Sequence, residues 1–201
     1  MRSVKFKLIP YYFIFGKIML SDKEILDAIK NGLLIVEPFD KEMLRPACLN
    51  LRLGPTIFEQ VQKGLIDPYD KESMKKCYKR VEIDDTSPYI LKPNAFILAL
   101  TYEKIGISKS LGVLLDGTST LARLGISITQ TAAIVDTGHG FPKPRRLTLE
   151  IKNNGLNPVK LYYKMKVVRM AIFRLEKEAS FGYDEKGKYK DGSVIPKPVK
   201  P

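Results

Sequence analysis

The sequence predicts a mainly β protein, a β-barrel or jelly roll with one short helix near its start. Short segments of strand length recur along the chain, and turn signals such as Lys92-Pro-Asn94 and Asn153-Asn-Gly155 separate them. One well-capped helix stands ahead of them, and many short strands with few helices are typical of barrels and jelly rolls. With 201 residues, of which 44% are hydrophobic and 28% charged, the chain is long enough for one sizeable core.

The helix is predicted to begin at Ser21. Ser21-Asp-Lys-Glu24 matches a capping box, in which Ser21 is the N-cap and Glu24 bonds back to it. Ile25, Leu26 and Ile29 then fall on one face, and Gly32 marks the expected end.

The strands are predicted from apolar runs and from alternation of apolar and polar residues. Leu49, Leu51 and Leu53 alternate with Asn50 and Arg52, as in a strand with one buried face. The other predicted strands cover residues 33–36, 95–102, 112–115, 126–131, 147–151, 159–163 and 167–175. Residues 62–88 are polar and weakly periodic, so we expect an excursion from the barrel there.

The net charge of +12 predicts attraction to polyanions, which include nucleic acid, an anionic membrane surface and nucleoside triphosphates. The lysines form no block and no zinc-finger spacing occurs, so nucleic acid is the weaker hypothesis. Residues 1–18 have the charged-then-apolar outline of a signal peptide. They lack a small-residue cleavage site and are too short to span a membrane, so no membrane partner is predicted.

The cysteine and histidine pattern argues against a metal site. Cys48 and Cys77 are too few and too far apart for a disulfide framework, and their number suits a reducing cytoplasm. His139 is expected to be a solvated loop residue. One histidine and two distant cysteines build no zinc site, and the H-x-E and P-C-x-x-C strings of zinc deaminases are absent. Any deamination is therefore predicted to be metal-free at the base.

The segment DGTSTLARLG at 116–125 carries the clearest sign of function. It follows an apolar run, so we expect a turn at Asp116-Gly117 and a short helical turn capped by Thr118, Ser119 or Thr120. Free N–H groups at a helix start, hydroxyls and the guanidinium of Arg123 together suit a polyphosphate. A capped turn with an exposed arginine is the alternative interpretation of the same residues.

Five ordered segments, including this motif, resemble the dCTP deaminase and dUTPase superfamily. The other four are LSDKEI at 20–25, PACLNLRLG at 46–54, QTAAIVDTG at 130–138 and LTLEIKNNG at 147–155. The resemblance covers most of the chain. It implies a distorted, jelly-roll-like β-barrel of the dUTPase fold that assembles as a homotrimer with sites at subunit interfaces.

The resemblance also suggests domain limits. Similar proteins start near a string like Met19-Leu-Ser, so residues 1–18 are interpreted as an upstream extension and 19–178 as the barrel domain. The basic, proline-rich tail at 179–201 would close over a bound nucleotide, or would be disordered.

Glu150 is the predicted general acid and base. Alternation places Glu150 with Thr148 and Lys152 on the face opposite Leu147, Leu149 and Ile151, away from the core. A solvated strand glutamate is the ordinary interpretation. The resemblance implies instead that this carboxylate activates water for attack on cytosine C4.

The remaining site roles are carried over from the resemblance. Asp136 matches the aspartate that orients water in dUTPases and lies near the sugar in deaminases, although an Asp-Thr-Gly turn explains it equally well. The implied water-orienting and substrate-binding residues are Ser119, Thr118, Thr120, Arg123, Ala132, Tyr183 and Lys188.

Three departures from the family pattern bear on the reaction. Thr118 stands where an arginine is frequent, and Ile134 stands where many deaminases have an arginine near the base. The 14 positions from Asp136 to Glu150 (150 − 136) exceed the family spacing, and the inserted loop carries Lys143, Arg145 and Arg146. This loop either contacts phosphate or lengthens a surface hairpin.

The sequence thus predicts, as first choice, a dCTP deaminase that releases dUTP and ammonia. Mg²⁺ would arrive with the triphosphate, with no zinc and no metal held by the protein itself. The runner-up is a dUTPase, or a bifunctional enzyme that yields dUMP, and Ile134 with the lengthened loop supports it. A non-enzymatic nucleotide or nucleic-acid binder with the same fold is the third hypothesis.

Overall fold

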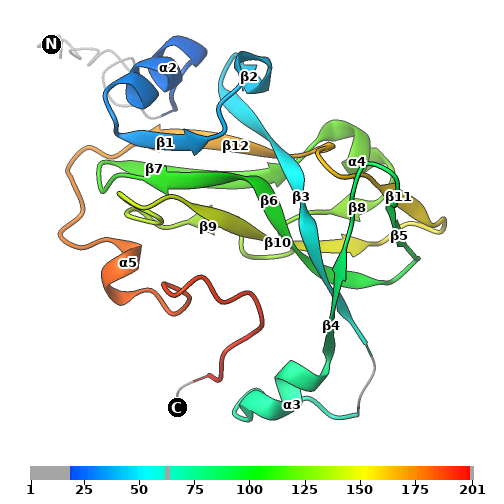
Figure 1. The fold of residues 1–201 in the computed structure, drawn as a ribbon. Coiled ribbons are helices and arrows are strands. Elements are labelled where there is room, and N and C mark those ends of the chain that lie inside the picture. The colour runs from blue at the N-terminus through cyan, green and yellow to red at the C-terminus, as the bar shows by residue number, and fades with distance from the viewer. Residues whose placement is uncertain (1–18, 62–63, 200–201) are drawn as a thin grey trace, which may run out of the picture.

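The computed structural model describes residues 19–61 and 64–199, which form a curled antiparallel sheet with a few short helices (Figure 1). The predicted extension at 1–18 lies outside the described residues. The helical elements are α2 (Asp22–Lys30), the 3-10 turn η1 (Lys41–Met43), α3 (Lys71–Lys76), α4 (Ser119–Arg123) and α5 (Tyr183–Lys186). The strands are β1 (Leu34–Glu37), β2 (Leu44–Arg45), β3 (Cys48–Gln60), β4 (Tyr78–Glu82), β5 (Tyr89–Leu91), β6 (Phe96–Ile107), β7 (Leu111–Gly117), β8 (Ile126–Ser127), β9 (Ile134–Val135), β10 (Arg145–Asn153), β11 (Val159–Leu161) and β12 (Lys166–Arg174). The prediction of a mainly β fold with a helix near the N-terminus is confirmed, and α2 is the longest helix in the described ranges.

The main sheet has the strand order β8-β10-β6-β3-β12-β7-β9, with β1 beside β6 and β2 and β4 beside β3. The central strand β3 pairs with β12 through its first half and with β6 and β4 through its second half. Its pairing with β6 is interrupted between Leu53 and Ile57. A Cβ at Gly54 would lie 2.8 Å from the carbonyl oxygen of Leu100. The backbone of β6 thus passes so close to β3 that a larger residue here would force the backbone to shift.

Helix α2 forms as the capping box predicts. The Ser21 hydroxyl accepts from the Glu24 amide at 3.4 Å, and the Glu24 carboxylate accepts from the Ser21 amide at 3.0 Å. Ile25 and Ala28 are buried, and the chain leaves the helix through Asn31 and Gly32, whose φ of 68° is left-handed. No helix in the described ranges is long and apolar enough to cross a membrane.

The core is built from the inward faces of the strands, as the alternation predicts. Leu49, Leu51 and Leu53 are fully buried. Leu147, Leu149 and Ile151 are also buried, which leaves Thr148 and Glu150 on the opposite face of β10. Burial of side chains of this size contributes roughly 1.5–3 kcal/mol each.

Two local predictions were wrong. Asp116 and Gly117 do not form a turn, because they pair with Arg169 and Val168 of β12 and so extend strand β7. The predicted strand at 126–131 ends after Ser127. The chain then turns, with the Ala132 amide donating to the Thr129 carbonyl at 2.9 Å.

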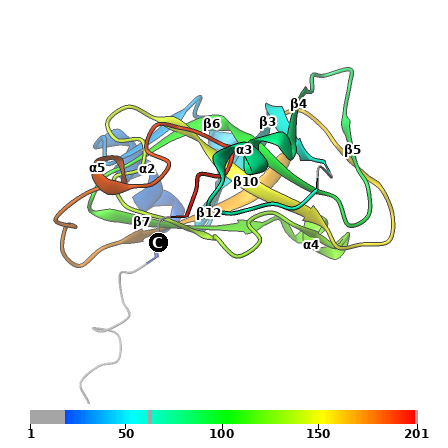
Figure 2. The ribbon, with the colours of Figure 1, turned by 90° about the horizontal axis from the view of Figure 1, so that it is seen from below.

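The excursion is partly regular, which its weak periodicity did not reveal. It contains helix α3 and strand β4, and β4 continues the sheet along the end of β3 from Thr56 to Gln60. The C-terminal tail runs from α5 across the molecule towards α3 (Figure 2). At its far end the Val199 amide donates to the Pro68 carbonyl at 2.9 Å, so the tail and the excursion meet.

Candidate active site

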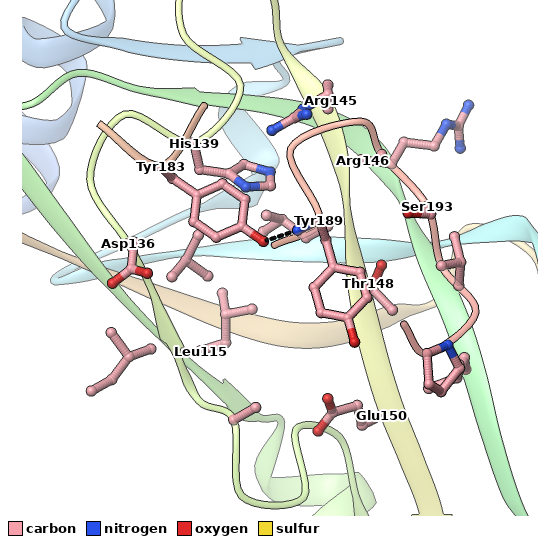
Figure 3. A pocket seen from close by; sticks show the side chains of 18 residues that line it. Leu115, Asp136, His139, Arg145, Arg146, Thr148, Glu150, Tyr183, Tyr189 and Ser193 are labelled. Carbon is pink, nitrogen blue, oxygen red and sulfur yellow. Dashed lines mark hydrogen bonds between the residues drawn. The ribbon is translucent and has the colours of Figure 1, made fainter. Parts of the chain in front are cut away.

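A cavity of about 250 Å³ lies between strand β10, the segment after β7 and the C-terminal tail (Figure 3). Its polar lining includes Glu150, Thr148 and Asp136, and it is completed by His139, Arg145, Arg146, Ser193 and two tyrosines of the tail. Its apolar lining includes Leu98, Leu115, Ala132, Ile134 and Val135. A small apolar hollow with a few convergent polar groups is the usual form of a small-molecule site.

Glu150 is held rigidly at the edge of this cavity. It lies opposite Leu98 of β6, and its amide donates to the Ile128 carbonyl at 2.9 Å. The carboxyl group is partly buried, and this burial raises the pKa of Glu150 above its ordinary value of 4.5. A carboxyl group with a raised pKa exchanges protons more readily near neutral pH.

Asp136 follows strand β9 and lines the same cavity with an exposed side chain. Strand β9 is held against β7 by pairing of Ile134 with Leu114 and of Val135 with Val113. One residue further on, the Thr137 carbonyl accepts from the Tyr183 amide at 2.7 Å, so the tail is attached beside Asp136.

Arg145 of the inserted loop fastens the tail. Its guanidinium pairs with Asp184 and donates to the Lys190 carbonyl, while Asp184 also accepts from the Gly140 amide at 3.2 Å. The sequence offered two roles for this loop, contact with phosphate or a lengthened hairpin. In the structure Arg145 has a role that neither of them describes, because it anchors the tail.

Two tyrosines of the tail face the cavity. The Tyr183 hydroxyl accepts from the Tyr189 amide at 3.1 Å, and the Tyr189 hydroxyl accepts from the Lys197 amide at 3.2 Å. In Figure 3 the Tyr189 hydroxyl points towards the part of the cavity that holds Glu150. The tail thus covers the cavity.

His139 is not the solvated residue that the sequence predicts. Its ring lies 5.5 Å from the Tyr183 ring, and its Nε2 is buried without a hydrogen-bond partner within the described structure. Burial, with a further effect from Arg145, lowers the pKa of His139 to about 4, so the ring is neutral at pH 7. The prediction failed because the tail covers this loop.

The phosphate motif lies apart from this cavity. Thr118 precedes α4 as its N-cap, but its side chain makes no capping bond. Ser119, Thr120 and Arg123 are exposed, and neither they nor Lys188 lines the cavity. The structure therefore brings Glu150, Asp136, Ala132 and Tyr183 together at one cavity and leaves the motif outside its lining.

Thr148 and Tyr189 line the cavity although no role was predicted for either of them, and the anchoring of the tail by Arg145 was not predicted. Thr148 could have been found, since alternation places it on the same face as Glu150. Arg145 and Tyr189 carried no local signal, because their positions depend on contacts between segments some 40 residues apart. Cys48 and Cys77 are free thiols. No group of three or more potential metal ligands occurs in the described ranges.

Comparison with known proteins agrees with the fold and with the sequence motifs. The family model for dCTP deaminase-like proteins matches residues 19–175. The protein named "dCTP deaminase, dUMP-forming" of Nanoarchaeum equitans is 36% identical over 183 residues, which cover 84% of this chain and 90% of that protein. The protein of the same name from Streptomyces avermitilis is 35% identical over 167 residues, which cover 82% and 84% of the two chains.

Among solved structures, the 2'-deoxycytidine 5'-triphosphate deaminase of Agrobacterium tumefaciens superposes with a TM-score of 0.61 at 17% identity. The match covers 79% of this chain and 48% of that one, so this chain spans about half the length of that protein. At this identity the similarity shows the fold alone. The family match and the sequence relatives together show that this chain belongs to the dCTP deaminase-like family.

Proposed function

We propose that this protein deaminates dCTP and then cleaves the resulting triphosphate, so that dUMP is its final product. The observation that carries the proposal is the partly buried Glu150 carboxyl group, which shares a small, largely apolar cavity with Asp136.

Deamination needs one group that takes a proton and later returns it. Glu150 would accept a proton from water as the oxygen attacks C4 of cytosine, and would then donate it to the departing amine. Water is consumed, the C4–N bond breaks, and ammonia and a uracil base are formed. Partial burial of Glu150 supports both halves of this cycle. Ala132, which is small and lines the cavity, leaves room for the pyrimidine ring.

The second step is hydrolysis of the triphosphate to dUMP and pyrophosphate. The name "dUMP-forming" of the relatives supports this product over the dUTP that the sequence alone favours. Asp136 would orient the attacking water. Mg²⁺ would arrive with the triphosphate and neutralise its charge, and the exposed carboxylate of Asp136 is the oxygen type that Mg²⁺ prefers.

A single subunit holds only part of the proposed site, and this supports a homotrimer. Ser119 and Arg123 are exposed and do not line the cavity, so a second subunit would have to supply them. Leu114 of β7 and Ile134 of β9 are paired and are also exposed, at 39% and 75%. Because Ile134 lines the cavity, this exposed pair lies beside the proposed site, where a second subunit would cover it. We propose that Ser119 orients the water that attacks cytosine. Arg123, with Thr118 and Thr120, would hold the triphosphate of a nucleotide bound in the cavity of the neighbouring subunit.

The tail and the domain limits belong to the same proposal. Residues 19–178 would form the catalytic barrel, and the tail from 179 would close over the nucleotide with Tyr183 and Lys188. The attachment of the tail through Arg145 and Asp184 supports this arrangement. Two free cysteines are consistent with action in the reducing cytoplasm.

The test is product analysis with dCTP and, separately, dUTP in the presence of Mg²⁺. We expect ammonia, pyrophosphate and dUMP from dCTP, and loss of ammonia release in Glu150→Gln. Glu176→Gln, at an exposed glutamate that does not line the cavity, is the matched control. Accumulation of dUTP would refute the second step and leave the first. Absence of turnover with both nucleotides, together with salt-dependent oligonucleotide binding, would replace the proposal with a non-enzymatic binder.

A further inference from the structure

A second hollow shares Arg146 with the Glu150 cavity. It measures about 290 Å³ and is lined by Glu37, Pro38, Tyr102, Lys104 and Arg146. This volume is close to the lower end of the ~300–1,000 Å³ range of small-molecule pockets. In Figure 3 the guanidinium of Arg146 points away from the Glu150 cavity, so it belongs chiefly to this second hollow.

The strand register places like charges next to each other here. Lys104 of β6 lies directly opposite Arg146 of β10 on one side and opposite Glu37 of β1 on the other. Like charges at directly opposed positions of neighbouring strands destabilise a sheet. The pair Lys104–Arg146 is therefore a local cost of this fold, and one that a bound anion would remove.

The ring of Tyr102 gathers further cations around the hollow. The guanidinium of Arg52 lies 5.0 Å from the ring centroid, the Lys164 ammonium 5.2 Å and the guanidinium of Arg146 5.9 Å. Cation–π attraction holds such groups in place at modest gain, but it does not cancel their charge.

The carboxylates nearby do not balance these cations. Glu103 is fully buried, and both of its oxygens are taken by Arg52, through the backbone amide at 2.8 Å and Nε at 2.6 Å. Lys104, Arg146 and Lys164 form no ion pair with any residue that the structure describes. Among the lining residues only Glu37 remains to offset the charges of Lys104 and Arg146, and Lys164 adds a third positive charge beside the Tyr102 ring.

We propose that this hollow, lined by Tyr102, Lys104 and Arg146 and with Lys164 beside the Tyr102 ring, binds a phosphate-bearing anion. Two lysine ammonium groups and a guanidinium supply strong charge-assisted donors, and the Arg146 fork suits two phosphate oxygens. One Arg146 donor, Nη1, is already used on the Thr101 carbonyl at 3.0 Å, which fixes the group at the rim. Anion binding here would be independent of the proposed reaction, because Lys104 and Lys164 do not line the Glu150 cavity and Arg146 lies at its border.

The test is calorimetric titration of the full chain with inorganic pyrophosphate. We expect binding that weakens with rising salt, and that falls at least about tenfold in Lys104→Ala/Lys164→Ala. The charge-retaining pair Lys104→Arg/Lys164→Arg should bind nearly as wild type does. Lys160→Ala, which removes an exposed strand lysine elsewhere, should leave binding unchanged.

Two further arms identify the source of the phosphate. Titration with deoxycytidine monophosphate shows whether the binding of a nucleotide's phosphate also requires Lys104 and Lys164. If it does not, the hollow binds only free pyrophosphate. The titrations are made in Arg123→Ala as well, which removes the competing phosphate contact of the proposed active site, and binding that depends on the two lysines should persist there. If pyrophosphate binding in Arg123→Ala survives loss of both lysines, or is lost equally in Lys160→Ala, the proposal is wrong. Unfolding curves of the variants check that the exposed lysines were removed without damage to the fold.

Discussion

Mixing two inactive variants tests whether the proposed site is shared between subunits. The perturbation is a pair of single changes, Glu150→Gln in one chain and Arg123→Ala in the other. Loss of the acid–base group should slow deamination by about 10²–10⁴-fold. Loss of the guanidinium should cost roughly 10- to 100-fold, since it removes a charge-assisted contact to phosphate.

The expected recovery follows from where the structure places the two residues. Glu150 lines the cavity, whereas Arg123 is exposed and takes no part in its lining. In a cyclic trimer each site would then combine Glu150 of one subunit with Arg123 of the next. After random exchange of equal amounts, a site is intact when the first chain is the Arg123 variant and the second the Glu150 variant. This occurs in about one quarter of the sites (1/2 × 1/2) in a trimer with closed symmetry.

The assay is ammonia release from dCTP by the mixture after reversible denaturation and refolding together, with analytical ultracentrifugation to establish the trimer. The same two proteins refolded separately and then combined provide the baseline. Recovery near one quarter of wild-type activity is expected. If activity stays at the baseline although hybrid trimers have formed, the two residues act within one subunit and the reasoning fails.

Two further predictions concern carboxyl groups. Glu150 must be ionised to act as the base, and burial raises its pKa above 4.5. The acidic limb of the pH profile of kcat/KM should therefore have its midpoint above pH 4.5. A midpoint at or below pH 4.5 would contradict the assignment of Glu150 as the base. In the buried ion pair, Arg52→Met should cost roughly 3–5 kcal/mol of unfolding free energy because it leaves the fully buried Glu103 unpaired. Glu103→Gln should cost only about 1–2 kcal/mol, because the partly exposed Arg52 still reaches water. Urea unfolding at fixed protein concentration measures both losses of unfolding free energy. Equal losses in Arg52→Met and Glu103→Gln would contradict this reasoning.

Local patterns in the sequence were enough for the fold class and for one face of the site. The capping box at Ser21 and the alternation at Leu49, Leu51 and Leu53 depend on neighbours a few residues away, and both are confirmed. Alternation also placed Glu150 on the face opposite the core, where the cavity lies. The alternation of apolar and polar residues can be read from neighbouring positions, and it predicts the two faces of a strand correctly wherever one face is buried.

The tertiary structure alone decided what surrounds those residues. His139 is partly covered because Tyr183 packs against it, and Arg145 anchors the tail at Asp184, 39 positions further along the chain. Asp116 and Gly117 became strand because β12 lay beside them. Each of these outcomes depends on contacts between distant segments, whose free energy is set by the packing of the whole sheet. No pattern within a few neighbouring residues encodes such contacts, and so the sequence predicted the elements and the Glu150 face, while the cavity took its shape from the tail folded over it.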